Sequence, residues 1–327
     1  MPRNGCRRAL VLVALAAIVA GGCSQGTTAA RKRLSIATGG TGGVFYPYGG
    51  AIARVISENL DGVEATAEVT GASVDNLKFI RQGTSDLALT MADTAQDAVA
   101  ARDAFADFGA VPARALAVLY PSYVHLVTRD GSGIARVSDL QGRIVSIGSP
   151  GSGTAVLAQR ILEAARLTAG RDLRTQSLGV AQSVDALKDG KIDAFFWNGG
   201  LPTAAIVDLV NTPGITARFI ATDDVLPQLQ QTYGPALYYR EVIPAATYGA
   251  EADTPVVGVA NLLVVSESMG EQLAYDITRL LFDKQADLIA VHPQAKELSL
   301  ETAVAGSPIP FHPGAIRFYR ERQVWKE

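Results

Sequence analysis

The stretch Leu34–Tyr48 reads LSIATGGTGGVFYPY and places four glycines between an apolar run and a helical pattern. The run Leu34–Ala37 has the apolarity of a buried strand, and apolar residues recur at helical spacing from Phe45 onward. A glycine-rich turn between a strand and a helix lets several backbone N–H groups point at one anion. A Walker phosphate loop is excluded, because that motif needs Lys and Ser/Thr after its last glycine and this chain has Val44-Phe45 there.

Strand-like runs and helical patterns alternate along the whole chain, which is typical of α/β proteins with parallel sheets. We expect strands at Leu34–Ala37, Ala65–Val69, Asp86–Met91, Ala115–Leu119, Ile144–Ile147, Thr175–Leu178, Asp193–Trp197, Ala217–Ile220 and Val256–Val265. A long amphipathic helix is expected from Ser268 to about Val291.

The length of 327 residues favours two lobes over one. We expect the chain to cross into the second lobe near Tyr120–Val127 and to return near Tyr238–Val259. Lobe I then comprises residues 34–122 and 256–327, and lobe II comprises residues 123–255.

The first residues indicate export. Three arginines precede an apolar run that is shorter than the roughly 20 residues needed to span a bilayer, so residues 1–22 are interpreted as a lipoprotein signal peptide. Small residues directly before Cys23 resemble a lipobox, in which Cys23 becomes the acylated N-terminus; ordinary cleavage near Gly22 is the alternative. Cys6 leaves with the signal, so the exported chain has one cysteine and no internal disulfide. We expect a periplasmic protein that is lipid-anchored to the membrane through Cys23, with residues 23–33 as a tether.

The charge balance excludes nucleic acid as a partner. The formal net charge is −3, and removal of the arginines in residues 1–22 makes it more negative. Binding to phosphate backbones needs clustered Lys and Arg, and this sequence has no basic stripe or tail.

A second glycine-rich loop, Gly148–Thr154, also follows a strand and opens a helix. Ligands of open parallel sheets bind at the carboxyl ends of the strands, where helix N-termini carry partial positive charge. If each lobe supplies one such loop, a small anionic molecule can be held between them by backbone N–H and hydroxyl groups.

Three further loops at strand ends supply candidates, around Ser73, Asp93 and Trp197. The predicted ligand-binding residues are Thr38, Thr41, Gly42, Gly43, Tyr46, Ser73, Asn76, Ser149, Gly151, Ser152, Gly153, Thr154, Trp197, Asn198 and Gly199. For Ser73 a helix N-cap is the alternative, and several glycines could serve only a turn. Trp197 is favoured because an aromatic ring beside an amide and two glycines suits stacking on a ligand.

Catalytic and metal sites are not expected, and no cofactor is predicted. The histidines His125, His292 and His312 lack metal-binding spacing, and there is no Cys-x-x-Cys pair. Ser152 is not a nucleophile elbow, because Pro150 stands where that motif needs glycine. A structural hydrogen bond is favoured for His125, with a position lining the cleft as the alternative.

No arginine lies inside the proposed loops, so a bidentate clamp on a carboxylate is not visible. Arg81, Arg143 and Arg160 are interpreted as solvated charges, although folding could bring one inward. Acidic ligands are therefore plausible, and neutral ligands stay open.

Several spaced motifs resemble the TAXI-type solute-binding subunits of tripartite ATP-independent periplasmic (TRAP) transporters. They are Thr38–Pro47, Thr70–Leu77, Val145–Thr154, Gly190–Trp197, His292–Glu297 and Pro310–Ala315, which together run along nearly the whole chain. The resemblance implies a type II periplasmic-binding fold, with two α/β lobes of mainly parallel sheet around a central cleft. It also implies a monomer that binds a small organic acid or amino acid, most of all a glutamate-like dicarboxylate, and delivers it to a sodium-coupled TRAP permease.

Two other classes of protein stay open at this point. An enzyme with two lobes, such as a phosphoribosyl transferase, would need charged groups for pyrophosphate and metal, and the loops are uncharged. A sensory protein that presents its ligand to a receptor kinase would share every feature of the cleft, and neighbouring genes would distinguish it from a transport protein.

Overall fold

The computed structural model describes residues 31–326 of the chain. The strands are β1 (Lys32–Ala37), β2 (Val63–Glu68), β3 (Leu87–Met91), β4 (Ala113–Arg129), β5 (Ile144–Ser146), β6 (Arg174–Gln176), β7 (Ala194–Gly199), β8 (Ala217–Ile220), β9 (Tyr239–Ile243) and β10 (Thr254–Ser266). The helices are α1 (Phe45–Asn59), α2 (Ser73–Gln82), α3 (Ala92–Val99), α4 (Gly153–Ala164), α5 (Val180–Lys188), α6 (Ala204–Val210), α7 (Leu226–Tyr233), α8 (Ala245–Tyr248), α9 (Glu271–Asp283), α10 (Gln285–Val291), α11 (Leu300–Ala303) and α12 (Pro313–Glu321).

The strands form one sheet in the order β2-β1-β3-β10-β4-β7-β5-β6, with β8 beside β4 and β9 beside β10. Strand β1 pairs parallel with β2 and β3, and β5 pairs parallel with β6 and β7. Strands β10 and β4 run antiparallel to each other and to β3 and β7. The α/β class is confirmed, but the sheet is mixed rather than mainly parallel, because these two long strands separate its two parallel parts.

Strands β4 and β10 are much longer than the runs predicted for them. The predicted strand Ala115–Leu119 is only the first part of β4, which continues through the predicted crossing to Arg129. Residues Tyr120–Tyr123 pair with Gly258–Asn261, between the two sets of parallel strands. The lobe boundaries that we propose, after residues 122 and 255, fall within these two strands.

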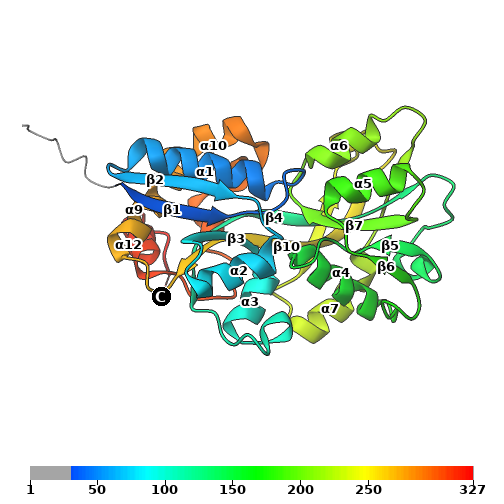
Figure 1. Cartoon of the computed structure of the whole chain (residues 1–327), viewed down its shortest axis with the longest axis horizontal. Coiled ribbons are helices and arrows are strands. Elements are labelled where there is room, and N and C mark those ends of the chain that lie inside the picture. The colour runs from blue at the N-terminus through cyan, green and yellow to red at the C-terminus, as the bar shows by residue number, and fades with distance from the viewer. Residues whose placement is uncertain (1–30, 327) are drawn as a thin grey trace, which may run out of the picture. The chain divides into compact units, whose positions relative to one another are not determined.

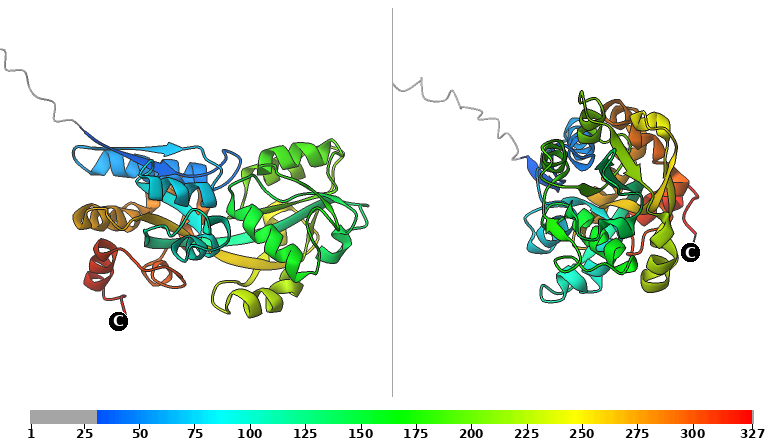
Figure 2. Two further views of the ribbon diagram at one scale, coloured as in Figure 1. Left: turned by 60° about the horizontal axis from the view of Figure 1, so that its bottom comes forward. Right: turned by 90° about the vertical axis from the view of Figure 1, so that its right-hand side faces the viewer.

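Helices cover both faces of each parallel part (Figure 1). Helices α1 and α10 lie above β1 and β2, with α2 and α3 below; in the other half α5 and α6 lie above β7, with α4 and α7 below. Figure 2 shows that the first and last thirds of the described chain gather in one half and the middle third in the other. Both halves therefore repeat the same layering of helices on parallel strands.

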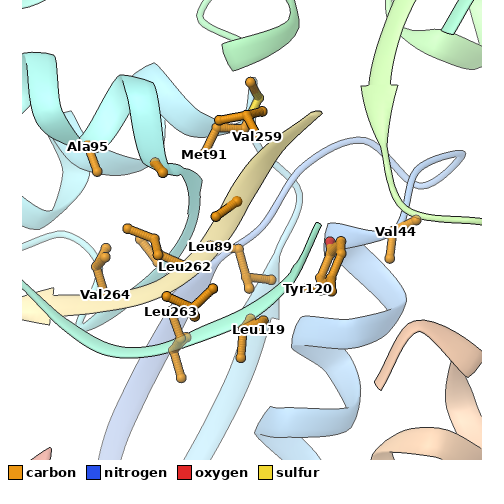
Figure 3. Close-up of a cluster of buried hydrophobic side chains, with 14 of the residues drawn as sticks. Val44, Leu89, Met91, Ala95, Leu119, Tyr120, Val259, Leu262, Leu263 and Val264 are labelled. Atoms are coloured by element: carbon orange, nitrogen blue, oxygen red, sulfur yellow. The ribbon is translucent and has the colours of Figure 1, made fainter. Parts of the chain in front are cut away.

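The core is apolar where the long strands meet β3 (Figure 3). Leu89, Leu262 and Leu263 are fully buried there. Tyr120 lies in the same cluster beside the first turn of α1. Asn261 of β10 pairs with both Met91 and Tyr120, so this packing aligns the end of β3 with the middle of β4.

One prediction about the C-terminal region is wrong. The helix expected from Ser268 to Val291 is two helices, α9 and α10, separated at Lys284. Trp325 lies beyond the end of α12 and packs edge-on against Phe311, with ring centroids 5.3 Å apart. The predicted signal peptide, Cys23 and most of the tether lie outside the described residues.

Candidate functional site

A cavity of about 330 Å³ lies where the loops at the ends of β1, β5 and β7 converge. Its wall combines the glycine-rich loop before α1 with the starts of α2, α4 and α5. The lining residues are Gly39, Gly40, Thr41, Gly42, Gly43, Val44, Phe45, Val69, Thr70, Gly71, Ala72, Ser73, Met91, Tyr120, Ser149, Ser152, Gly153, Thr154, Gly179, Val180, Ala181, Gln182, Trp197, Asn198 and Gly199. The cavity thus takes residues from both halves of the sheet.

Four helix N-termini meet at this cavity. Residues at the starts of α1, α2, α4 and α5 all belong to its lining. The first N–H groups of a helix have no partner within the helix, and the helix dipole adds partial positive charge at that end. The cavity is therefore electropositive without a single charged side chain among the described residues that line it.

At the start of α4, backbone N–H donors stay available to a ligand in the cavity. The Ser152 hydroxyl accepts a hydrogen bond from the Ala155 N–H (3.0 Å) and donates one to the Ser149 carbonyl (2.7 Å). Ser152 is thus the N-cap, while the next two residues, Gly153 and Thr154, line the cavity with their N–H groups at the helix end.

The backbone before α2 is strained. Ala72 has φ 84° and ψ −146°, a conformation that usually requires glycine and costs about 1–3 kcal/mol. Its N–H donates to the Thr70 hydroxyl (3.0 Å), and the Ser73 hydroxyl accepts from the Met91 N–H (3.1 Å). Strained backbone of this kind persists where it serves a site, and here it turns the first residues of α2 toward the cavity.

Two buried polar groups of the lining have no hydrogen-bond partner among residues 31–326. They are the Tyr120 hydroxyl and the Asn198 Oδ1 atom. Tyr120 is 2% exposed, and burial raises its pKa well above the usual value, so the hydroxyl keeps its proton. A buried polar group without a partner costs about 1–3 kcal/mol, so both groups are available to form hydrogen bonds with a polar ligand.

Trp197 forms one wall of the cavity in a fixed orientation. Its Nε1–H donates to the Thr203 hydroxyl (2.9 Å), and the Thr203 N–H donates to the Tyr248 hydroxyl (2.9 Å). A Cβ atom on Gly43 would lie 2.7 Å from the Cη2 atom of Trp197. The glycine at position 43 therefore allows the loop from the other half of the sheet to rest on the indole.

His125 bonds to the Tyr248 hydroxyl behind Trp197, but it does not line the cavity. Its Nε2 atom lies 3.2 Å from the Tyr248 hydroxyl and its Nδ1 atom 2.9 Å from the Tyr123 carbonyl oxygen. Burial lowers the pKa of His125 to about 4, so the ring is neutral at pH 7. The favoured interpretation of His125, a structural hydrogen bond, is confirmed.

Direct contacts join the two sides of the cavity. The Gly151 carbonyl accepts from the N–H groups of Val74 (3.0 Å) and Asp75 (3.2 Å) at the start of α2. On the other side, the Ala205 N–H donates to the Gly42 carbonyl (3.4 Å). The described conformation is therefore closed around the cavity.

The structure brings most of the predicted site residues together. Those that line the cavity are Thr41, Gly42, Gly43, Ser73, Ser149, Ser152, Gly153, Thr154, Trp197, Asn198 and Gly199. The predicted residues Thr38, Tyr46, Asn76 and Gly151 are outside the lining.

The four exceptions have physical reasons. The Thr38 hydroxyl donates to the Glu68 carbonyl of the neighbouring strand, and Gly151 serves the contact to α2. Tyr46 follows the lining residue Phe45 on α1, and consecutive residues of a helix point about 100° apart.

Asn76 is a structural residue. It is fully buried, and its Nδ2 atom contacts the carbonyls of Ala37 (3.3 Å), Thr38 (2.7 Å) and Leu89 (2.7 Å). Its Oδ1 atom accepts from the Thr70 hydroxyl (2.6 Å). Asn76 thus joins the ends of β1 and β3 and supports the cavity from behind.

The start of α5 and Tyr120 line the cavity but are not among the residues predicted from the sequence. Gly179 and Val180 follow the predicted strand Thr175–Leu178. The order of strand, glycine and helix is the same as in the two glycine-rich loops. A single glycine is the only local signal in this case. Tyr120 carries no local signal, because it lies in the middle of β4.

Arg160 is not a solvated charge. Its side chain is 4% exposed, and it pairs with buried carboxylates away from the cavity. Among residues 31–326, no cluster of three or more His, Cys, Asp or Glu has a metal-binding arrangement. Within the same part of the chain, every helix is too short or too polar to cross a bilayer.

Comparison with known proteins gives a family and a fold. The sequence model of the NMT1-like family matches residues 36–322. A structure from work on glutathione import via GshT and the cystine importer TcyBC of Streptococcus mutans is 12% identical, with 87% of this chain and 99% of that chain covered and a TM-score of 0.51.

Two further solved structures are similar. The ligand-binding core of GluR0 in complex with L-glutamate is 11% identical (82% and 98% covered, TM-score 0.50). An ancestral arginine-binding protein bound to arginine is 13% identical (83% and 100% covered, TM-score 0.50). At these identities the similarity shows the fold, which is that of type II periplasmic-binding proteins.

Proposed function

The chain belongs to the NMT1-like family, and from that premise we propose that it is an extracytoplasmic solute-binding protein for a small organic acid or amino acid. The observation that carries the proposal is the closed cavity of about 330 Å³ at which four helix N-termini converge. Such a volume is at the small end of ligand pockets and suits a metabolite rather than a nucleotide or an oligosaccharide. Helix N-termini suit an anionic group.

The ligand has both an anionic end and a group that donates hydrogen bonds. Carboxylates fit the N–H groups at the starts of α1, α2, α4 and α5. The unpartnered Oδ1 atom of Asn198 accepts hydrogen bonds, so it suits an ammonium, amide or hydroxyl group. A glutamate-like dicarboxylate meets both requirements, and L-glutamate and arginine are the bound molecules of two proteins with this fold.

Binding rather than catalysis fits the lining. The described lining residues include no His, Cys, Asp, Glu, Lys or Arg. These are the side chains that most often act as general acids, bases or nucleophiles at neutral pH. The hydroxyl of Ser152 is engaged as a helix cap rather than paired with a base.

Delivery to a membrane permease completes the proposed role. The motifs Thr38–Pro47 and Val145–Thr154 support a TAXI-type subunit of a sodium-coupled TRAP transporter. The chain would act as a monomer that presents its closed lobes to the permease. Permease genes beside this gene would support uptake, whereas a lone receptor-kinase gene would contradict it.

A thermal-shift screen of amino acids and organic acids tests the proposed function. A ligand at about 100 times its dissociation constant adds roughly 2.7 kcal/mol to the unfolding free energy, which such a screen detects. We expect L-glutamate, L-glutamine or 2-oxoglutarate among the hits. Shifts caused only by sugars, metals or nucleotides would contradict the proposal.

Replacing Tyr120 by phenylalanine should change binding and stability in opposite directions. Tyr120→Phe removes a buried hydroxyl that has no partner among residues 31–326, so unfolding of the ligand-free protein should require about 1 kcal/mol more. Ligand affinity should fall about tenfold, because one hydrogen bond to the ligand is worth about 1.5 kcal/mol. Calorimetric titration and urea unfolding measure the two effects, and unchanged affinity would remove Tyr120 from the site.

The lipid anchor is part of the proposal. Cys23→Ala should release the protein into the soluble periplasmic fraction or leave it unprocessed, because acylation needs the thiol. Phase partitioning in detergent measures the result. Unchanged partitioning of the variant would contradict anchoring at this residue.

A further inference from the structure

A buried ionic cluster lies outside the ligand cavity. The guanidinium of Arg160 contacts Asp97 (Nη2 to Oδ2, 2.5 Å), Asp103 (Nη2 to Oδ2, 2.6 Å) and Asp93 (Nη1 to Oδ2, 3.8 Å). The Arg160 and Asp97 side chains are 4% and 8% exposed, and Asp93 is fully buried. Removing a charged group from water is costly, so such a cluster needs an explanation.

Two tyrosines complete the cluster. The Tyr238 hydroxyl donates to Asp93 Oδ2 (2.9 Å) and accepts from Arg160 Nη1 (2.9 Å). The guanidinium also lies over the ring of Tyr233, 4.2 Å from its centroid. The guanidinium is therefore contacted by carboxylates, a hydroxyl and an aromatic ring of the fold.

The members of the cluster come from opposite sides of the cavity. Asp93 and Asp97 belong to α3 and Asp103 to the 3₁₀ turn after it, in proposed lobe I. Arg160 belongs to α4, in proposed lobe II, whose first residues line the cavity. The cluster thus joins the two lobes through the same helix that presents its N-terminus to the ligand.

The charges of the cluster do not balance. Three carboxylates contact one guanidinium, while Glu163 and Arg166 lie together near Tyr233 at the edge of the cluster. Two carboxylates close together resist joint ionisation, and burial disfavours the charged form further. A proton bound to one of them relieves both penalties.

We propose that Arg160 is a positioning residue that latches α4 to α3 when the lobes close, and that closure takes up a proton at Asp97. The location of the proton follows from the hydrogen bonds. Burial raises the pKa of Asp93 as well, but Arg160 and the hydrogen bonds from the Thr94 N–H (2.7 Å), the Thr94 hydroxyl (3.2 Å) and Tyr238 lower it by stabilising the carboxylate. Asp97 has Arg160 as its side-chain partner in the cluster.

A second cavity provides a route for the proton. It measures about 270 Å³, lies between α4 and α7, and is lined by Arg160, Glu163, Arg166 and Tyr233 among others. Water in this cavity would reach the cluster without passing the ligand. Proton uptake can therefore follow the pH of the surrounding solution.

The direction in which pH changes the ligand affinity follows from the pKa of Asp97 in the closed and open forms. Burial raises the pKa of Asp97 to about 6 in the closed form, where the attraction of Arg160 lowers it and the negative charges of Asp93 and Asp103 add to the rise. When the lobes separate, water reaches Asp97 and its pKa returns toward the usual value of about 3.9. Protonation therefore favours the closed form, and ligand affinity should rise as the pH falls through 6.

The inference rests on the proposed function, and calorimetry with L-glutamate as the probe tests it between pH 8 and 5.5. Affinity should increase about fourfold over this range, and binding at pH 6 should take up about half a proton, measured in buffers of different ionisation enthalpy. Asp97→Asn mimics the protonated residue, so it should bind tightly at pH 8 without proton uptake. Asp61→Asn is the matched control, because Asp61 is exposed in the turn after α1 and takes no part in the cluster, and it should keep the wild-type pH profile.

Two results would overturn the latch: wild-type binding without proton uptake, or an Asp97→Asn variant whose uptake equals that of the wild type. If L-glutamate does not bind, small-angle scattering of the ligand-free protein tests the latch alone. The radius of gyration should then fall between pH 8 and 5.5 in the wild type and stay constant in Asp97→Asn. A radius that does not change with pH in the wild type would overturn the latch by itself.

Discussion

A Gly43→Ala variant should lose about 100-fold in ligand affinity, equivalent to about 2.7 kcal/mol, while it keeps its fold. The added Cβ would lie 2.7 Å from Cη2 and 3.0 Å from Cζ2 of Trp197, and the indole cannot turn away easily because Thr203 holds its N–H. Overpacking of this kind costs about 1–3 kcal/mol, and the contact exists only when the two sides of the cavity meet. The penalty therefore falls on the closed form. Calorimetric titration with a ligand from the screen measures the loss.

Two control variants test whether the loss of affinity comes from the contact with Trp197. Gly50→Ala adds the same methyl group to α1 at a position with nothing within 4 Å, so it should bind like the wild type and gain up to about 1 kcal/mol of stability. The double variant Gly43→Ala with Trp197→Phe removes the atoms that clash, and it should recover part of the affinity. Wild-type affinity in Gly43→Ala alone would show that the contact with Trp197 is not part of the ligand-bound state.

An Asn76→Ala variant should lose about 3 kcal/mol of unfolding free energy, with little change in the affinity of the folded protein. The substitution removes one buried amide that serves three carbonyls and one hydroxyl, and each buried group left without a partner costs about 1–3 kcal/mol. Asn76 is outside the cavity lining, so the ligand loses no direct contact. Urea unfolding measures the stability, and calorimetric titration measures the affinity.

Asn59→Ala is the matched control for this prediction. Asn59 lies at the end of α1, is exposed, and makes one hydrogen bond to the Val55 carbonyl (2.8 Å). Its removal should change the stability by no more than about 0.5 kcal/mol. If Asn76→Ala instead lost ligand binding at unchanged stability, the earlier interpretation of Asn76 as a ligand residue would be correct.

The two substitutions distinguish two roles among the residues predicted for the site. Gly43 allows one surface to approach another, so its effect appears in binding. Asn76 joins strand ends within one half of the molecule, so its effect appears in folding. The distinction between the two kinds of residue rests on tertiary contacts, which spacing along the chain does not reveal.

The sequence by itself determined the features that depend on neighbouring residues. The strand, glycine-rich turn and helix of Leu34–Tyr48 recur at Gly148–Thr154, and both loops line the cavity. Glycine is required there because the backbone approaches another surface closely, and that requirement is local enough to be seen in the sequence. Alternation of apolar runs with helical patterns likewise indicated the α/β class.

Only the tertiary structure decided which distant groups meet. Tyr120 reaches the cavity because β4 runs on past its predicted end, and the sheet is mixed because β4 and β10 run antiparallel through its centre. The sequence pattern predicts Arg160 as a solvated charge on an amphipathic helix. In the structure it is enclosed by carboxylates of α3 and by tyrosines of α7 and the segment that follows α7. Burial, orphaned hydrogen-bond groups and shifted pKa values all arise from contacts between residues far apart in the chain, and no periodicity in the sequence encodes them.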